Sequence, residues 1–207
     1  MSVILFQGDS ITDGERQQSE CGQLGYGYPA YVAGRLGLGK PGAYTFCNRG
    51  ISGNRVVDVY ARIKQDIINL QPDYMSLLIG VNDVWHELAY QNGIDRNKFR
   101  VLYQMLLDEV LEALPHIKII LMEPFVLRAP ETDEQYSLFR KEVELRAEVV
   151  CSLSAEYNFP LIRLQEDLDA MEQSAPQNYW LRDGVHPTAY FHQYIADKWL
   201  ETFHTLL

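Results

Sequence analysis

The sequence predicts an α/β fold in which parallel strands alternate with helices that cover both faces of one sheet. Short apolar runs alternate along the chain with longer stretches whose apolar residues recur every three or four positions. This alternation is typical of parallel strands joined by right-handed helical crossovers. The chain has 207 residues and shows no internal repeat, low-complexity tract or linker. We therefore expect residues 1–207 to form a single domain.

Five apolar runs are the candidate strands of this sheet. The first, Val3-Ile4-Leu5-Phe6, has the uninterrupted apolar character of a buried parallel strand. The candidate strands cover residues 3–7, 44–47, 74–79, 117–122 and 160–164. The stretches between them are long enough to hold the crossover helices that parallel strands require.

Helical periodicity is clear between the third and fourth candidate strands. Within residues 97–114, Phe99, Tyr103 and Leu106 fall on one helical face, and Asn97 is the expected N-cap. The other predicted helices cover residues 55–69, 136–157 and 188–205. Three segments look irregular, namely 13–27, 123–135 and 165–182. Long irregular segments usually form functional rims, so we expect these three to surround one crevice.

Charge and composition exclude several classes of partner. The chain carries 18 basic and 28 acidic residues, a formal net charge of −10. Nucleic acid and anionic membranes need clustered Lys and Arg, so neither is expected as a partner. No apolar stretch approaches the roughly 18 residues of a membrane-spanning helix. The three cysteines, Cys21, Cys47 and Cys151, form no CxxC pair and are expected as reduced thiols.

Three further expectations concern location, assembly and cofactors. The chain begins without a basic segment followed by a long apolar one, which predicts no secretory signal and a cytoplasmic location. Its 13 Tyr, 8 Phe and 3 Trp offer anchors for a homo-oligomer interface, although core packing explains them equally well. Neither metal-ligand spacing nor a phosphate-binding glycine loop is present, so we expect no metal and no cofactor.

A serine near the start and a histidine near the end form the most informative pair. Ser10 lies in Gly8-Asp9-Ser10, directly after the first candidate strand, where open α/β sheets bind their ligands. Near the other end, Asp183-Gly184-Val185-His186-Pro187 places a carboxylate three residues before a histidine. A serine needs a base to become a nucleophile, and the base needs an orienting partner. The two segments supply all three groups.

Two more segments complete a pattern of four. Asn48-Arg49-Gly50-Ile51-Ser52-Gly53 and Gly80-Val81-Asn82-Asp83 each follow a candidate strand. In this order, across residues 8–188, the four segments resemble the sequence blocks of the SGNH (GDSL-type) esterase/lipase family. The resemblance implies a flavodoxin-like three-layer α/β/α sandwich with a five-stranded parallel sheet, which agrees with the strand count above.

The resemblance also implies roles for individual residues. Ser10 matches the family's nucleophile, His186 the general base, and Asp183 the carboxylate that orients the base. Gly53 and Asn82 match the residues whose backbone N–H and side-chain amide form the oxyanion hole together with the N–H of Ser10. Losing one such donor typically costs about 10²–10³ in kcat.

Each segment also has an ordinary structural explanation when it is taken alone. Gly8-Asp9-Ser10 and Asp183-Gly184 are typical turns, and Asn82 is a typical helix cap. All these explanations must hold together in the family's order, which favours the catalytic interpretation. Trp85 and Trp180 are candidates for binding substrate: Trp85 as a platform on which a sugar stacks, and Trp180 as a wall of the acyl pocket, although a packing role explains Trp180 about as well.

More local similarity indicates the substrate. Asn48–Asn54, Ile79–Trp85, Met122-Glu123-Pro124-Phe125 and Gly25-Tyr26-Gly27-Tyr28 resemble the versions in intracellular bacterial acetylxylan esterases. This implies a small acyl ester, an acetylated oligosaccharide, that is deacetylated through an acyl-enzyme. Two alternatives stay open: a thioesterase or lysophospholipase with the same catalytic residues, and a sugar-binding module without turnover.

Overall fold

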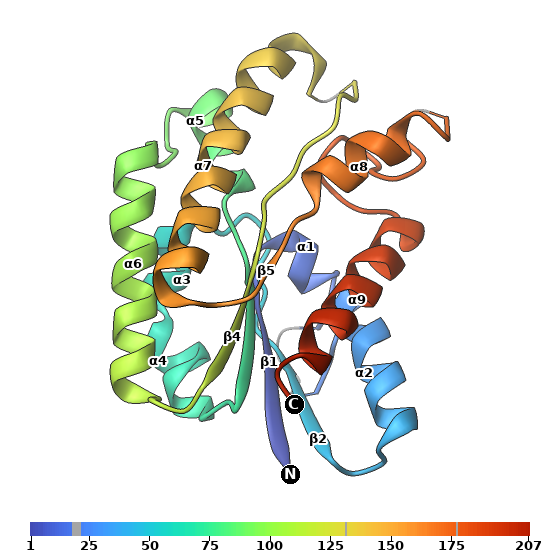
Figure 1. Cartoon of the computed structure of the whole chain (residues 1–207). Coiled ribbons are helices and arrows are strands. Elements are labelled where there is room, and N and C mark those ends of the chain that lie inside the picture. The colour runs from blue at the N-terminus through green and yellow to red at the C-terminus, as the bar shows by residue number, and fades with distance from the viewer. Residues whose placement is uncertain (18–21, 131, 177) are drawn as a thin grey trace.

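One five-stranded sheet runs through the centre of the molecule (Figure 1). The computed structural model describes residues 1–17, 22–130, 132–176 and 178–207. Neighbouring strands are parallel and follow the order β2-β1-β3-β4-β5. The strands are β1 (Ser2–Gly8), β2 (Tyr44–Asn48), β3 (Tyr74–Leu78), β4 (Lys118–Met122) and β5 (Leu161–Ile162). The predicted α/β fold and its five strands are confirmed, although β5 has only two residues.

Each central strand contributes side chains to two hydrophobic cores, one on either face of the sheet. In β1, Ile4 and Phe6 pack into one core and Leu5 into the other, and none of the three is exposed. Successive side chains of a strand point to opposite faces, so an uninterrupted apolar run requires cover on both. The apolar character of the first predicted strand therefore follows from its central place in the sheet.

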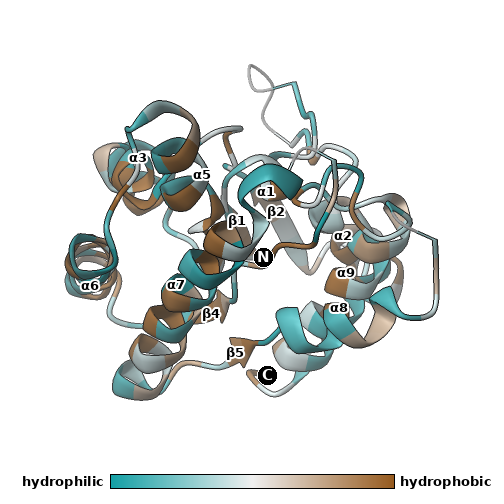
Figure 2. Ribbon diagram, turned by 90° about the horizontal axis from the view of Figure 1, so that it is seen from above, coloured by the Kyte–Doolittle hydropathy of each residue, from teal (hydrophilic) through white to brown (hydrophobic). Residues whose placement is uncertain are grey.

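Two layers of helices provide that cover (Figures 1 and 2). One layer contains α2 (Tyr28–Gly39), α8 (Gln165–Glu172) and α9 (Ala189–His204). The other contains α3 (Val56–Ala61), α4 (Ile63–Asp66), α6 (Arg96–Ala113) and α7 (Tyr136–Tyr157). The remaining helical elements are α1 (Ser10–Asp13), α5 (Val81–Tyr90), η1 (Ile68–Leu70) and η2 (Asp133–Gln135). The result is the three-layer sandwich of the predicted fold.

The helix predictions were less accurate than the strand predictions. The predicted helix 55–69 is broken into α3, α4 and η1, and α8 occupies part of the segment 165–182 that was expected to be irregular. Asn97 is not the N-cap of α6, so that prediction was wrong. Asp95 caps this helix, because its Oδ1 accepts hydrogen bonds from the backbone N–H groups of Asn97 (3.0 Å) and Lys98 (3.1 Å).

The strand order brings three loops together at one edge of the sheet. β1 is flanked by β2 on one side and β3 on the other, so the strand order reverses beside β1. Ligands of open α/β sheets bind at such a point, beyond the carboxyl ends of the strands. Ser10 follows β1, Gly53 follows β2 and Asn82 follows β3. The sheet thus collects these three candidate residues at one edge, beyond the carboxyl ends of its strands.

Two observations bear on the expectations from composition. Within the described residues, none of the helices is both long and apolar enough to cross a membrane. Cys151 is a free thiol, whereas Cys21 lies outside the described residues.

Candidate active site

Ser10 is the first residue of α1 and lies directly beyond the end of β1. The turn into the helix is fixed by Asp9, whose Oδ1 accepts a hydrogen bond from the N–H of Ile11 (3.0 Å). The N–H of Asp13 then closes on the carbonyl of Asp9 (2.8 Å). A carboxylate at this position satisfies one of the free N–H groups that every helix start exposes. Asp9 therefore braces the turn that presents Ser10.

Asp183 and His186 lie on a short hairpin, residues 181–187, which we call the Asp–His hairpin. An antiparallel bridge joins Leu181 to Pro187, and the N–H of Arg182 donates to the carbonyl of His186 (2.8 Å). Inside the turn, Asp183 Oδ1 accepts hydrogen bonds from the N–H groups of Val185 (3.0 Å) and His186 (2.7 Å). One oxygen of the carboxylate thus fixes the turn and leaves the other for the imidazole.

Ser10, His186 and Asp183 form a continuous line of contacts. Ser10 Oγ lies 2.8 Å from His186 Nε2, and His186 Nδ1 lies 2.5 Å from Asp183 Oδ2. Burial raises the pKa of Asp183, but the hydrogen bonds from the His186 ring and from two backbone N–H groups outweigh it and lower the pKa to about 2. An ionised carboxylate only accepts, so Nδ1 of His186 carries the proton and Nε2 is left to accept from Ser10.

Asn82 lies beside the backbone that follows Gly53. Its amide Nδ2 donates to the carbonyl of Asn54 (3.2 Å), which links the start of α5 to the loop after β2. Gly53 has a φ of +79°, a conformation that favours glycine because an L side chain is strained there. The structure therefore brings the two candidate oxyanion-hole residues to neighbouring positions.

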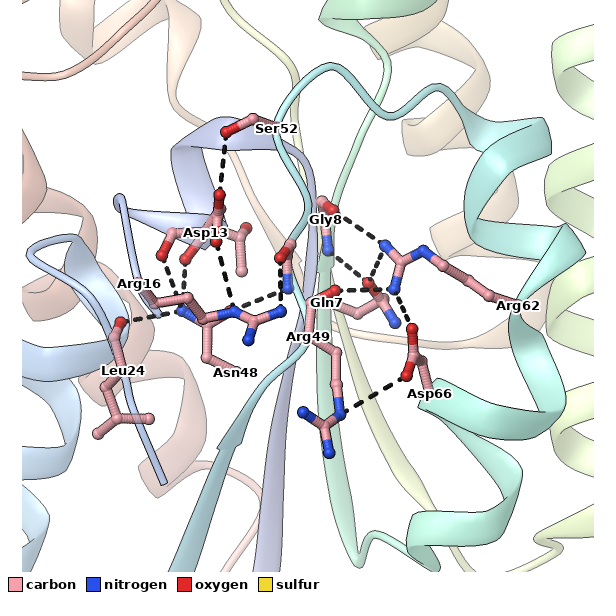
Figure 3. A network of polar contacts seen from close by, with 12 residues as sticks. Gln7, Gly8, Asp13, Arg16, Leu24, Asn48, Arg49, Ser52, Arg62 and Asp66 are labelled. Atoms are coloured by element: carbon pink, nitrogen blue, oxygen red, sulfur yellow. Dashed lines mark hydrogen bonds and ion pairs between the residues drawn. The ribbon is translucent and has the colours of Figure 1, made fainter. Parts of the chain in front are cut away.

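The 49–54 loop, which carries Gly53, is fastened from below by a buried polar network (Figure 3). The Asn48 amide donates to the carbonyls of Thr12 (2.6 Å) and Leu24 (2.9 Å), and its Oδ1 accepts from the N–H of Gly50 (2.9 Å). Arg16 Nη2 donates to the carbonyl of Gly50 (3.0 Å). This network holds the loop against the segment that follows Ser10.

Two buried carboxyl groups near the site have raised pKa values. Burial raises the pKa of Asp9 to about 7, and its Oδ2 has no hydrogen-bond partner among the described residues. Burial also raises the pKa of Asp83, which accepts from the N–H of Val56 through both oxygens (3.1 Å each). This contact joins the start of α5 to the start of α3.

A cleft of about 560 Å³ opens beside Ser10 and His186. Its other lining residues include Tyr26, Tyr31, Glu15, Arg182 and His192, and of these the sequence analysis had singled out only Tyr26, in the segment Gly25-Tyr26-Gly27-Tyr28. Burial lowers the pKa of His192 to about 4, so its imidazole is neutral, and its Nδ1 accepts from the N–H of Tyr28 (3.2 Å). Within the described part of the chain, no cluster of His, Cys, Asp and Glu is arranged to hold a metal ion.

The two candidate tryptophans lie in different places. The Trp85 ring lies beside His186, with 6.1 Å between ring centroids, and lines a smaller hollow of about 270 Å³. Trp180 instead donates its indole N–H to the carbonyl of Met171 (3.0 Å) and packs edge-on against Tyr179. Neither tryptophan is among the described residues that line the cleft at Ser10, and Trp85 is the one that lies beside the His186 ring.

Comparison with known proteins agrees with this arrangement. Residues 6–194 match the GDSL-like lipase/acylhydrolase family. The chain is 34% identical over 204 residues to an acetylxylan esterase of Geobacillus stearothermophilus, covering 95% of this chain and 91% of that protein. The match to the family spans nearly all of the sheet and every candidate catalytic residue.

Solved structures give the same result. A GDSL-like lipase from Parabacteroides merdae has a TM-score of 0.92 and 37% identity, covering 97% of this chain and 94% of that one. Axe2, an acetylxylan esterase from G. stearothermophilus, has a TM-score of 0.86 and 31% identity over 97% and 93% of the two chains. Variants of Axe2 with a serine, an aspartate or a histidine replaced by alanine are described as catalytic mutants. This chain therefore belongs to the GDSL-like lipase/acylhydrolase (SGNH) family and is a carboxylic ester hydrolase related to acetylxylan esterase.

Proposed function

We propose that the protein is a serine acetylesterase that removes acetyl groups from acetylated oligosaccharides. The observation that carries this proposal is the line of contacts from Ser10 Oγ through the His186 ring to Asp183, with distances of 2.8 and 2.5 Å. A neutral imidazole in this position accepts the serine proton as the hydroxyl attacks a carbonyl carbon. The relative Axe2 supports the same three residue types, because its catalytic mutants change a serine, an aspartate and a histidine.

In the first half of the reaction, Ser10 Oγ attacks the acetyl carbonyl while His186 Nε2 takes its proton. The imidazolium that forms is stabilised by the Asp183 carboxylate. The N–H groups of Ser10 and Gly53 and the amide of Asn82 bind the oxyanion of the tetrahedral intermediate. His186 then gives its proton to the sugar oxygen as the C–O bond breaks, which leaves an acetyl group on Ser10.

In the second half, water replaces the sugar hydroxyl. The water oxygen attacks the acetyl carbon while His186 takes a proton from that water. His186 then returns the proton to Ser10 Oγ as acetate leaves. Both halves develop negative charge on the same carbonyl oxygen, so the same donors serve twice.

Two features support a short acyl group on a sugar. The similarity to acetylxylan esterase covers 95% of the chain, and Axe2 is described as an acetyl-xylooligosaccharide esterase. The rim segment beyond β4 carries an exposed ion pair between Arg128 and Asp133 (3.4 Å). A charged rim is a poor surface for a long acyl chain, which prefers apolar cover.

The test is a set of initial rates on p-nitrophenyl esters from two to twelve carbons, with acetylated xylo-oligosaccharide alongside. Wild type is compared with Ser10→Ala and with Ser152→Ala, which removes a serine on α7 rather than in the cleft. We expect the highest rates on the two-carbon ester, acetate release from the oligosaccharide, and loss of both only in Ser10→Ala.

Three outcomes would change the assignment. A maximum at eight or more carbons would make the protein a thioesterase or lysophospholipase of the same family. Unchanged rates in Ser10→Ala would exclude Ser10 as nucleophile. Failure of the folded wild type to react with a serine-directed fluorophosphonate would favour a binding module without turnover.

A further inference from the structure

We propose that Arg62 is a positioning residue for the oxyanion hole. In this proposal its guanidinium holds the 49–54 loop against the end of β1 and, through Asn54, orients the amide of Asn82. The inference rests on the proposed function, because it assigns a task to Arg62 within the same reaction. It extends the site to a residue that contacts neither Ser10 nor substrate.

Arg62 lies at the junction of α3 and α4, and its side chain turns inward with only 14% of its surface exposed. On the side of β1, Nη2 donates to Gln7 Oε1 (2.8 Å) and, at a longer distance, to the carbonyl of Gly8 (3.4 Å). Gln7 Oε1 also accepts from the N–H of Gly8 (3.0 Å), so the guanidinium and the strand end share one acceptor. Figure 3 shows Arg62 directed at these two residues. They immediately precede Asp9 and Ser10.

The same guanidinium also holds both ends of the 49–54 loop. Nη1 donates to the carbonyl of Arg49 (2.8 Å), and Nε donates to Asn54 Oδ1 (2.9 Å). One planar group thereby spans the loop from its first residue to its last. Because the guanidinium is rigid, it fixes the separation of these two residues as well as their distance from β1.

Asn54 passes this constraint to the oxyanion hole. Its side chain is held by Arg62, and its backbone carbonyl accepts one N–H of the Asn82 amide (3.2 Å). A primary amide has two N–H donors, and fixing one fixes the direction of the other. The second donor of Asn82 is therefore aimed by Asn54, and the position of Asn54 is set by Arg62.

Arg62 forms more hydrogen bonds than a stabilising ion pair with Asp66 alone would need. Arg62 has five N–H donors, and its acceptors are Gln7, Gly8, Arg49, Asn54 and Asp66. Only Asp66 (2.8 Å) is a charge partner, and the other four lie at the end of β1 or in the loop. Burial lowers the pKa of Arg62. A buried guanidinium is costly unless its donors are satisfied, and here the satisfying groups are those that frame the reaction.

Arg62→Met tests the proposal with Arg140→Met as the matched control. Arg140 is also largely covered, with 21% of its side chain exposed, and also forms an i,i+4 ion pair, with Glu144 (2.7 Å). It lies on α7 and bonds to Asp169 rather than to the site. Measurements on p-nitrophenyl acetate give kcat and KM, thermal unfolding gives Tm, and a boronic acid serves as an analogue of the tetrahedral adduct.

We expect Arg62→Met to lower kcat by roughly 10- to 100-fold, the scale of a misplaced oxyanion donor, with KM within about threefold of wild type. The affinity for the boronic acid should fall by the same factor as kcat/KM. A purely structural role would lower Tm without this selective loss of transition-state binding. Arg140→Met should keep kcat within about twofold while lowering Tm to a similar extent.

Asn54→Ala provides a second, milder variant, which removes one acceptor of Arg62 and leaves its four other hydrogen bonds in place. It should lower kcat about tenfold, and the double variant should lose less than the product of the two single losses. Arg62→Lys, which keeps the charge but not the fork, should recover only part of the activity. These two variants carry the test if Arg62→Met does not fold.

The proposal is overturned if Arg62→Met has the same kcat as Arg140→Met. If Arg62→Met does not fold, the same comparison is made with Asn54→Ala. It is also overturned if the loss appears in KM alone, or if the two single effects multiply. These results leave the proposed function intact when the wild type shows Ser10-dependent turnover. A wild type without such turnover refutes the proposed function itself, and the proposal for Arg62 then falls with it.

Discussion

The two sides of Ser10 are built in different ways. On one side, Asp183 and His186 lie three residues apart on the Asp–His hairpin, and each keeps about a quarter of its side chain exposed. Their hydrogen bonds to each other are local to that turn. On the other side, the loop that carries Gly53 is fixed by Arg16, Asn48 and Arg62, through bonds that span up to 55 residues. The orientation of His186 by Asp183 depends on a local motif, whereas the position of the loop that carries Gly53 depends on the tertiary fold.

The carboxyl groups on the two sides show the same contrast. The hydrogen bonds from His186 and from backbone N–H groups keep the pKa of Asp183 at about 2, despite partial burial. Asp9 is fully enclosed and has one hydrogen bond from Ile11, and burial raises its pKa to about 7. Burial dominates at the fully enclosed Asp9, whereas the donors that face the less deeply buried Asp183 outweigh burial and keep it ionised.

The largest effect is expected for Asp183→Asn, which breaks the local side. The amide can hold the turn but presents the wrong hydrogen-bonding pattern to Nδ1, so the imidazole adopts the wrong tautomer. We expect kcat to fall about 10⁴-fold, with little change in Tm because the amide oxygen can still accept the two backbone N–H bonds inside the turn. Steady-state rates and thermal unfolding measure the two quantities. A variant that loses activity only in proportion to its unfolded fraction would contradict this expectation.

A smaller effect, on stability, is expected for Asn48→Ala, which breaks the long-range side. The substitution removes donors from the buried carbonyls of Thr12 and Leu24 and an acceptor from the N–H of Gly50. Leaving buried groups unsatisfied costs about 1–3 kcal/mol each, so we expect the free energy of unfolding to fall by about 3 kcal/mol. Urea unfolding, with the exposed Asn97→Ala as control, measures the loss. Equal stability of the two variants would show that the network is not needed for the fold.

A third effect, which appears only as the pH changes, is expected in the stability of the protein and is tested with Asp9→Asn. With a folded pKa of about 7 and an ordinary unfolded value near 3.9, Asp9 holds a proton in the folded state that the unfolded chain releases. The wild type therefore loses stability as the pH rises from about 4 to 7, with no further change from this group above 7. The variant lacks this decline. Urea unfolding at pH 5 and pH 8 measures it, and parallel pH curves for the two proteins would refute the assignment.

Local patterns predicted the elements that carry the site. The strand before Ser10 is buried on both faces, and its apolar run identified it. The long helices α6 and α7 were predicted from their periodicity. The helix α2 was missed because Gly34, Gly37 and Gly39 weaken its helical pattern, and packing against α9 stabilises it instead.

The candidate catalytic residues could be predicted from the sequence, but the residues that hold them in position could not. Ser10, Asp183 and His186 each lie in a short motif, so their chemistry is visible in the sequence. The role proposed for Arg62 depends on contacts 8 to 55 residues away, and these exist only after the β2–β1–β3 crossovers have formed. No local pattern marks Arg62 among the 18 basic residues of the chain. The same holds for His192 and Arg182 in the cleft.

The contact between Ser10 and His186 joins residues 176 positions apart. During synthesis Ser10 is made directly after β1, whereas His186 follows only after all five strands, shortly before α9. A chain still being translated therefore carries a serine without a base until the hairpin has left the ribosome and packed against the finished sheet. In the proposed mechanism, hydrolysis therefore begins only once both segments have folded onto the same sheet.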